Sequence, residues 1–155
     1  MARKEQDIYF MSLALEEAGV AFSEGEVPVG AVLVSVDGAL LSRAHNKKEN
    51  LQDPTAHAEI AAMRDGAGIV QNWRLNGTTL YVTKEPCIMC AGTMIHARIG
   101  RLVYGCDDSK GGAVNSLYTL LTDKRLNHQV DVVSGVLEKE CAAILKRFFE
   151  DRRRC

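Results

Sequence analysis

The sequence predicts a layered α/β domain built on a mixed β-sheet. Apolar segments rich in β-branched residues alternate along the chain with segments whose apolar residues recur every three or four positions, as they do on one face of a helix. Asp37-Gly38 between two strand segments is a strong hairpin signal, so one strand pair is antiparallel. Strands joined through a helical crossover pair in parallel. Helices covering a sheet with both strand directions are therefore expected.

The first half of the chain is expected to fold as a helix followed by the hairpin. The helix ends before Gly25, and its apolar stripe consists of Ile8, Met11, Leu15, Ala18 and Phe22. The hairpin strands cover 29–36 and 39–44. Asp53-Pro54 predicts the start of a second helix, because Asp can cap free N–H groups and Pro is tolerated at the first helical position. This helix would run to about Gly66.

The second half repeats the alternation of strand and helix. Strands are expected at 78–83, 101–104 and 130–136, a short helix at 88–96 and a loop at 107–112. The closing helix has one apolar face, formed by Cys141, Ile144, Leu145, Phe148 and Phe149. Because no linker or repeat divides the chain, we expect a single domain over residues 1–155.

Composition narrows the class of protein. The 155 residues are 46% hydrophobic, which is enough for a packed core. A net charge of −1, from 19 basic and 20 acidic residues, argues against diffuse attraction to nucleic acid, so any RNA contact must be local. Five cysteines with no apolar leader and no membrane-length apolar run favour a reducing cytoplasm, without membrane attachment.

Candidate metal ligands occur at the starts of two predicted helices. One imidazole comes from His57 and two thiols come from Cys87 and Cys90, which are three residues apart and can face one side of a helical turn. Three protein ligands leave a tetrahedral zinc ion one open position for water, as in catalytic rather than structural sites. Glu59, two residues after His57, is interpreted as a proton carrier and not as a fourth ligand.

These motifs carry a family resemblance. His57-Ala58-Glu59 with Pro86-Cys87-x-x-Cys90 resembles the zinc nucleoside and nucleobase deaminases, a family with this signature. The chain is most similar to bacterial tRNA adenosine deaminases, and the similarity covers nearly all of it. The segments that carry this closer resemblance are 26–32, 53–59, 85–92 and 94–96, continuing through 98–101, the loop with Lys110, 140–143 and 148–149.

The resemblance implies a three-layer α/β/α, cytidine deaminase-like fold with a five-stranded mixed sheet. It also implies one Zn²⁺ per chain held by His57, Cys87 and Cys90, with Glu59 moving protons during hydrolytic deamination. The substrate-binding residues that it implies are Asn46, Val29, Gly30, Ala58 and Pro86.

The implied substrate is a tRNA anticodon stem-loop, in which adenosine at the wobble position becomes inosine. Candidate RNA contacts are Lys110, Phe149 and Arg152. Each also has an alternative explanation: Lys110 as a solvated charge in a loop, Phe149 as part of the core, and Arg152 as a cation that complements the dipole at the end of a helix. A homodimer with residues 94–101 near the partner chain is also implied.

Two other functions remain open at this point. A deaminase of a free nucleobase such as guanine would share the Asp53–Glu59 motif and the paired cysteines. A structural zinc module that binds RNA or protein without turnover would need a fourth ligand, for which His96, Cys106 and Glu59 are candidates.

Overall fold

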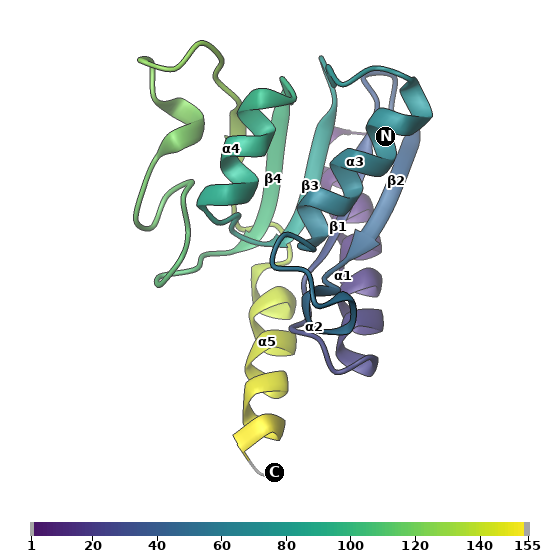
Figure 1. Cartoon of the computed structure of the whole chain (residues 1–155), viewed down its shortest axis with the longest axis vertical. Helices are drawn as coiled ribbons and strands as arrows, with labels where there is room; N and C mark the ends of the chain where they lie inside the picture. Colours follow the sequence, from purple (N-terminus) through teal and green to yellow (C-terminus); the bar gives the residue numbers. More distant parts are fainter. Residues whose placement is uncertain (1, 154–155) are drawn as a thin grey trace.

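The computed structural model of the chain, which describes residues 2–153, has a five-stranded mixed sheet in the order β2-β1-β3-β4-β5 (Figure 1). β1 pairs antiparallel with β2 and β3, whereas the β3–β4 and β4–β5 pairs are parallel. The hairpin and the parallel crossovers predicted from the sequence are thus confirmed. The strands are β1 Gly30–Val34, β2 Leu40–His45, β3 Thr79–Lys84, β4 Arg101–Cys106 and β5 Asp131–Val133.

Helices cover both faces of this sheet, which confirms the three-layer α/β/α fold (Figure 1). One apolar core lies under α3 and α4 and contains Ala31 and Leu33 of β1. The other core lies under α1 and α5 and contains Val32 and Val34 of the same strand. Alternate side chains of β1 therefore fill opposite cores, as the period of a strand requires. The helices are α1 Arg3–Ser23, α2 Lys48–Leu51, α3 Ala58–Val70, α4 Ile88–His96 and α5 Glu138–Arg153, with a 3-10 turn at Leu120–Thr122.

The buried face of α1 differs from the predicted stripe. Ile8 is exposed, while Asp7 is buried and receives two hydrogen bonds from Arg101. Small side chains at Ala14 and Ala18 face the sheet, because α1 crosses β1 in close contact at Gly30. The stripe was predicted from hydrophobicity alone. In the structure, the buried face of α1 is also determined by the small size of side chains near the sheet and by the ion pair of Asp7 with Arg101.

The second helix begins later than predicted. Asp53 does not cap it; its carboxylate instead accepts hydrogen bonds from the backbone N–H and the hydroxyl of Thr55, which closes a local turn. The helix, α3, starts at Ala58 after His57 in extended conformation. The last strand is also shorter than 130–136, since the left-handed backbone at Gly135 ends it. None of the helices within residues 2–153 is long and apolar enough to span a membrane.

Candidate active site

Two adjacent helix starts bring together the three predicted metal ligands. His57 and Cys87 immediately precede α3 and α4, and Cys90 lies in the first turn of α4. His57 Nδ1 lies 3.6 Å from Cys87 Sγ and 3.5 Å from Cys90 Sγ, and one ligand atom from each residue lies within 4.8 Å of the others. One imidazole nitrogen and two sulfurs are a donor set that suits zinc. The residues therefore fit a metal ion.

Within residues 2–153, no fourth His, Cys, Asp or Glu joins this group of ligand atoms. Cys106 donates its thiol to the Thr83 carbonyl instead, and the cluster includes neither His96 nor Glu59. The arrangement lacks the fourth protein ligand that a structural zinc module would need.

Local electrostatics favour ionisation of one thiol. Hydrogen bonds to Cys90 and His57 lower the pKa of Cys87 to about 3. The same hydrogen bond raises the pKa of Cys90, since the pair shares one proton. Cys87 also precedes a helix N-terminus, where the partial positive charge of the backbone stabilises a thiolate. A thiolate is the form that binds a metal.

Glu59 is a buried carboxyl group beside the ligands. It belongs to the first turn of α3, with only 4% of its surface exposed. Burial raises its pKa, because the charged form loses its hydration. A carboxyl group with a raised pKa holds a proton more readily than an exposed one, which suits it to general acid–base catalysis.

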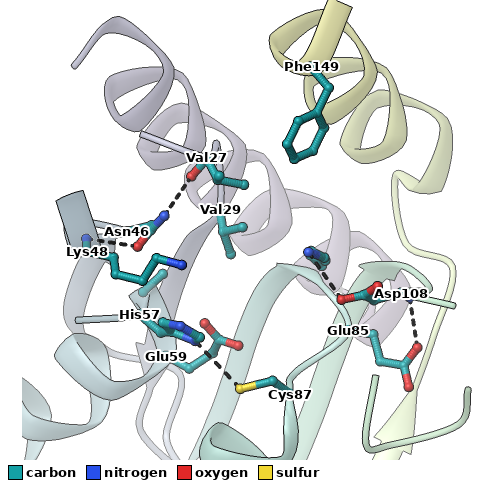
Figure 2. A pocket seen from close by; sticks show the side chains of 12 residues that line it. Val27, Val29, Asn46, Lys48, His57, Glu59, Glu85, Cys87, Asp108 and Phe149 are labelled. Carbon is teal, nitrogen blue, oxygen red and sulfur yellow. Dashed lines mark hydrogen bonds and ion pairs between the residues drawn. The ribbon is translucent and has the colours of Figure 1, made fainter. Parts of the chain in front are cut away.

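A pocket opens above this cluster, and most of the predicted substrate-binding residues line it (Figure 2). Asn46 is held in place by two contacts: its amide nitrogen donates to the Val27 carbonyl, and its side-chain oxygen accepts the Lys48 backbone N–H. An amide nitrogen has two hydrogens, and the contact with Val27 uses one of them. The pocket is lined by Val27, Val29, Asn46, Lys48, His57, Ala58, Glu59, Lys84, Glu85, Cys87, Asp108 and Phe149.

Two predicted pocket residues have other surroundings. Gly30 does not line the cavity; a side chain there would meet the backbone of α1, with the Ala14 carbonyl oxygen 1.9 Å from an added Cβ. Pro86 is buried beside the pocket, where its carbonyl accepts the N–H of Ala113. Pro86 thus links the start of α4 to the segment that follows the 107–112 loop.

The three candidate RNA contacts also differ in placement. Phe149 is 42% exposed and its ring points toward the pocket (Figure 2). Lys110 is exposed in its loop and does not line the cavity. The Arg152 guanidinium lies over the Phe148 ring and donates to the Gly25 carbonyl, which ties α5 to the end of α1.

Sequence reasoning missed two buried acids that shape the walls. Glu26 accepts the backbone N–H groups of Glu49 and Asn50 and so fixes α2. Glu85 accepts five hydrogen bonds, all from donors of the segment 108–116. Both residues fall in motifs that the sequence displays, but their partners lie about 23 to 31 residues away in the chain. A charged residue beside a buried strand was the only local signal.

Fold and site together define a hydrolytic deaminase of the nucleobase type, and the model of the MafB19-like deaminase family matches residues 4–153. A protein described as tRNA-specific adenosine deaminase from Bacillus subtilis (strain 168) is 47% identical over 149 residues, covering 96% of this chain and 92% of that protein. The chain therefore belongs to the family of tRNA-specific adenosine deaminases.

Solved structures agree with this assignment. One from studies of A-to-I editing by tRNA:A34 deaminases at the wobble position of transfer RNA is 48% identical, with a TM-score of 0.84 over 88% of this chain and 98% of that chain. A guanine deaminase from Bacillus subtilis is less similar, at 32% identity and a TM-score of 0.62, covering 69% of this chain and 66% of that one.

Proposed function

We propose that this protein hydrolytically deaminates adenosine to inosine at the wobble position of a tRNA anticodon, with one Zn²⁺ per chain. The observation that carries the proposal is the three-ligand cluster of His57, Cys87 and Cys90 beside the buried Glu59, at the base of a pocket. The high identity to tRNA-specific adenosine deaminases over nearly the whole chain supports the choice of substrate.

The chain's own residues account for most steps of the reaction. When bound by His57, Cys87 and Cys90, zinc would lower the pKa of a water molecule and so supply a nucleophile at neutral pH. Glu59 accepts the proton of that water and delivers protons to the ring nitrogen and then to the departing ammonia. The side-chain amide of Asn46 orients the nucleoside, while Val29 and Ala58 form the wall against which it lies.

An anticodon loop is a favourable substrate for such a pocket. A base inside a duplex must be flipped out at a cost of a few kcal/mol, whereas a loop base is already unpaired. A net charge of −1 gives no diffuse attraction to RNA. Selectivity for this RNA therefore has to come from aromatic stacking and from a few local cations. Phe149 would stack on a base, a role supported by its exposed ring at the pocket, while Lys110 and Arg152 remain candidate contacts to the RNA backbone. The enzyme would work in the cytoplasm as a homodimer.

The proposal is tested by incubating the purified zinc-loaded protein with total tRNA and measuring inosine by mass spectrometry of the digested nucleosides. We expect inosine at the wobble position of tRNA with adenosine there, and much slower conversion of free adenosine. Efficient turnover of free guanine or adenosine with no reaction on tRNA would instead assign the protein to free-base deamination.

A further inference from the structure

The charged side chains that line the pocket are not equally satisfied. Glu85 is already saturated: although burial opposes its ionisation, the donors around it hold its pKa at about 2. Asp108 forms an ion pair with Lys84, with Nζ and Oδ2 3.2 Å apart. Lys48, in contrast, forms no ion pair within residues 2–153, and it lies in the pocket beside His57 (Figure 2). The pocket therefore carries one unpaired and one partly neutralised cation.

These two lysines come from different walls. Lys48 is the first residue of α2, beyond the end of the edge strand β2, and Lys84 ends β3. In Figure 2, Lys48 and Asp108, the partner of Lys84, stand on opposite sides of the His57–Cys87 pair. β1 separates β2 from β3 in the sheet, so the separation follows from the topology. If the base of a nucleotide reached Glu59, the sugar–phosphate backbone of its strand would lie between the two ammonium groups.

We propose that Lys48 and Lys84 bind the phosphodiester groups that flank the deaminated nucleotide. The inference rests on the proposed function, since it requires a substrate that is a polynucleotide strand. Lys is a point-charge ligand for phosphate, and its ammonium has three donors. Lys84 can therefore keep Asp108 and still donate to a phosphate oxygen. Asp108 holds the Lys84 side chain in place before the RNA arrives, which lowers the ordering cost of the contact.

The proposal gives the pocket a means of distinguishing a strand from a free base. A free nucleobase or nucleoside has no phosphate, so the two lysines add nothing to its binding. Because the net charge of the chain is −1, these local contacts are not masked by diffuse attraction to a basic surface. Each phosphate contact on a single strand contributes about 0.7 to the slope of log affinity against log salt concentration.

The test measures that slope for a fluorescent anticodon stem-loop by anisotropy, using zinc-loaded full-length protein in a Glu59→Ala background that prevents turnover. Lys48→Gln and Lys84→Gln should each reduce the slope by about 0.7. Lys84→Arg should retain the slope, since it keeps the charge. Lys47→Gln is the matched control, because Lys47 is exposed and adjacent but does not line the pocket. Melting temperature and zinc content verify that each variant is folded.

Slopes for Lys48→Gln and Lys84→Gln equal to those of the parent and of Lys47→Gln would overturn the proposal. Loss of slope in only one of them would overturn the two-sided contact. Failure of the proposed function is a separate result: the protein with Glu59 intact would bind the stem-loop, with the same lysine dependence or without it, and yet form no inosine.

Discussion

Glu59 and His57 are two residues apart, yet their side chains are suited to different tasks because of the backbone around them. His57 has φ −76° and ψ 153°, an extended conformation that precedes α3, whereas Glu59 is already helical. The extended residue turns its imidazole toward the sulfurs of Cys87 and Cys90. The helical one has its carboxyl group buried at the first turn of α3. Spacing alone suggested that Glu59 is not a ligand, and the position of the helix start gives the reason.

Replacing Glu59 by Ala should separate metal binding from catalysis. We expect Glu59→Ala to retain about one zinc per chain and to lose nearly all turnover, because the three ligands remain and the proton carrier is gone. Zinc content by mass spectrometry and inosine formation on tRNA measure the two properties. A variant that loses its zinc would show that Glu59 is a ligand.

Cys87→Ala and Cys90→Ala provide the comparison, since both should lose zinc as well as activity. Some loss of stability is expected too, because the ligands connect the starts of α3 and α4. If Cys90→Ala remained zinc-loaded and active, the ligand assignment would be wrong.

A second residue-scale feature is the buried Asp7. Its carboxylate accepts hydrogen bonds from both terminal nitrogens of Arg101 and from the Tyr81 hydroxyl, at 2.6–2.8 Å. Burial alone would raise the pKa of Asp7, but the hydrogen bonds and the charge of Arg101 outweigh it and hold the pKa below the ordinary value of 3.8. A lowered pKa in the folded state gives stability that is complete above the unfolded-state pKa and disappears as pH falls through the folded-state value.

Asp7→Asn should therefore destabilise the protein in a pH-dependent manner. At pH 7 it leaves the Arg101 charge buried without its partner, at a cost of about 3 kcal/mol in the free energy of unfolding. The difference from the parent should begin to shrink as pH falls below the ordinary pKa of 3.8, and it should vanish once pH is below the lowered pKa of Asp7 in the folded protein. Urea unfolding at pH 7 and pH 3 measures this.

Asp65→Asn is the control for that measurement, because Asp65 is exposed on α3. This substitution removes the same charge, and the expected change in the free energy of unfolding is below about 0.5 kcal/mol. A destabilisation by Asp7→Asn that is equal at both pH values would contradict the ionic explanation.

At the scale of elements, the sequence predicted best where the signals are local. The bounds of α4 agree with the predicted 88–96, and the Asp37-Gly38 hairpin forms as expected. The predicted start of α3 was wrong, because Asp53 and Pro54 are as common in turns as at helix starts, and here they form a turn. Helix α2 was not predicted, since it is four residues long and depends on the distant Glu26 carboxylate.

Close packing of α1 on β1 is another element-scale property that periodicity could not reveal. Gly30→Ala would place a methyl group against the α1 backbone, within 1.9 Å of the Ala14 carbonyl oxygen. Since backbone cannot move aside as a side chain can, we expect the loss in unfolding free energy to exceed about 3 kcal/mol, and α1 to separate from the sheet. Denaturant unfolding of the purified variant measures it.

Gly68→Ala offers a matched substitution, because Gly68 lies in α3 with nothing within 4 Å of an added Cβ. It should stabilise the protein by about 0.5–1 kcal/mol, the usual gain from Ala over Gly inside a helix. Equal effects of the two substitutions would show that the contact of Gly30 with α1 is looser than its geometry indicates.

At the scale of the molecule, the site combines what sequence motifs display with what only folding assembles. The ligands and Glu59 were predicted from two short motifs, because metal chemistry constrains residue type and spacing. Lys84 and Asp108 of the opposite wall were not predicted, since they come from two segments that meet Asn46 and Lys48 only in the folded chain. In the sequence, Phe149 fitted the apolar face of the closing helix as well as it fitted an RNA contact. In the structure its neighbour Phe148 is buried and packs against Phe22, while Phe149 is exposed at the pocket.

The outer surface near residues 94–101 bears on the expected homodimer. Met94 and Ile99 are buried within the chain itself and so cannot form the contact alone. Trp73, however, is 56% exposed two residues before Leu75, whose N–H donates to the Ala97 carbonyl, and the nearby Ile69 at the end of α3 is exposed as well. Exposed aromatic and aliphatic side chains of this kind are common at the centres of subunit interfaces.

We therefore expect a dimer whose stability depends on these side chains. Sedimentation at low micromolar concentration should give twice the mass of one chain, and Trp73→Ala with Ile69→Ser should shift the equilibrium toward monomer, since truncated interface anchors commonly cost about 2 kcal/mol or more each. Val36→Ser, at an exposed apolar residue next to the Asp37-Gly38 turn, should leave the mass unchanged. A parent protein that sediments only as monomer would contradict dimerisation itself, whereas a dimer insensitive to both substitutions would place the interface on another face.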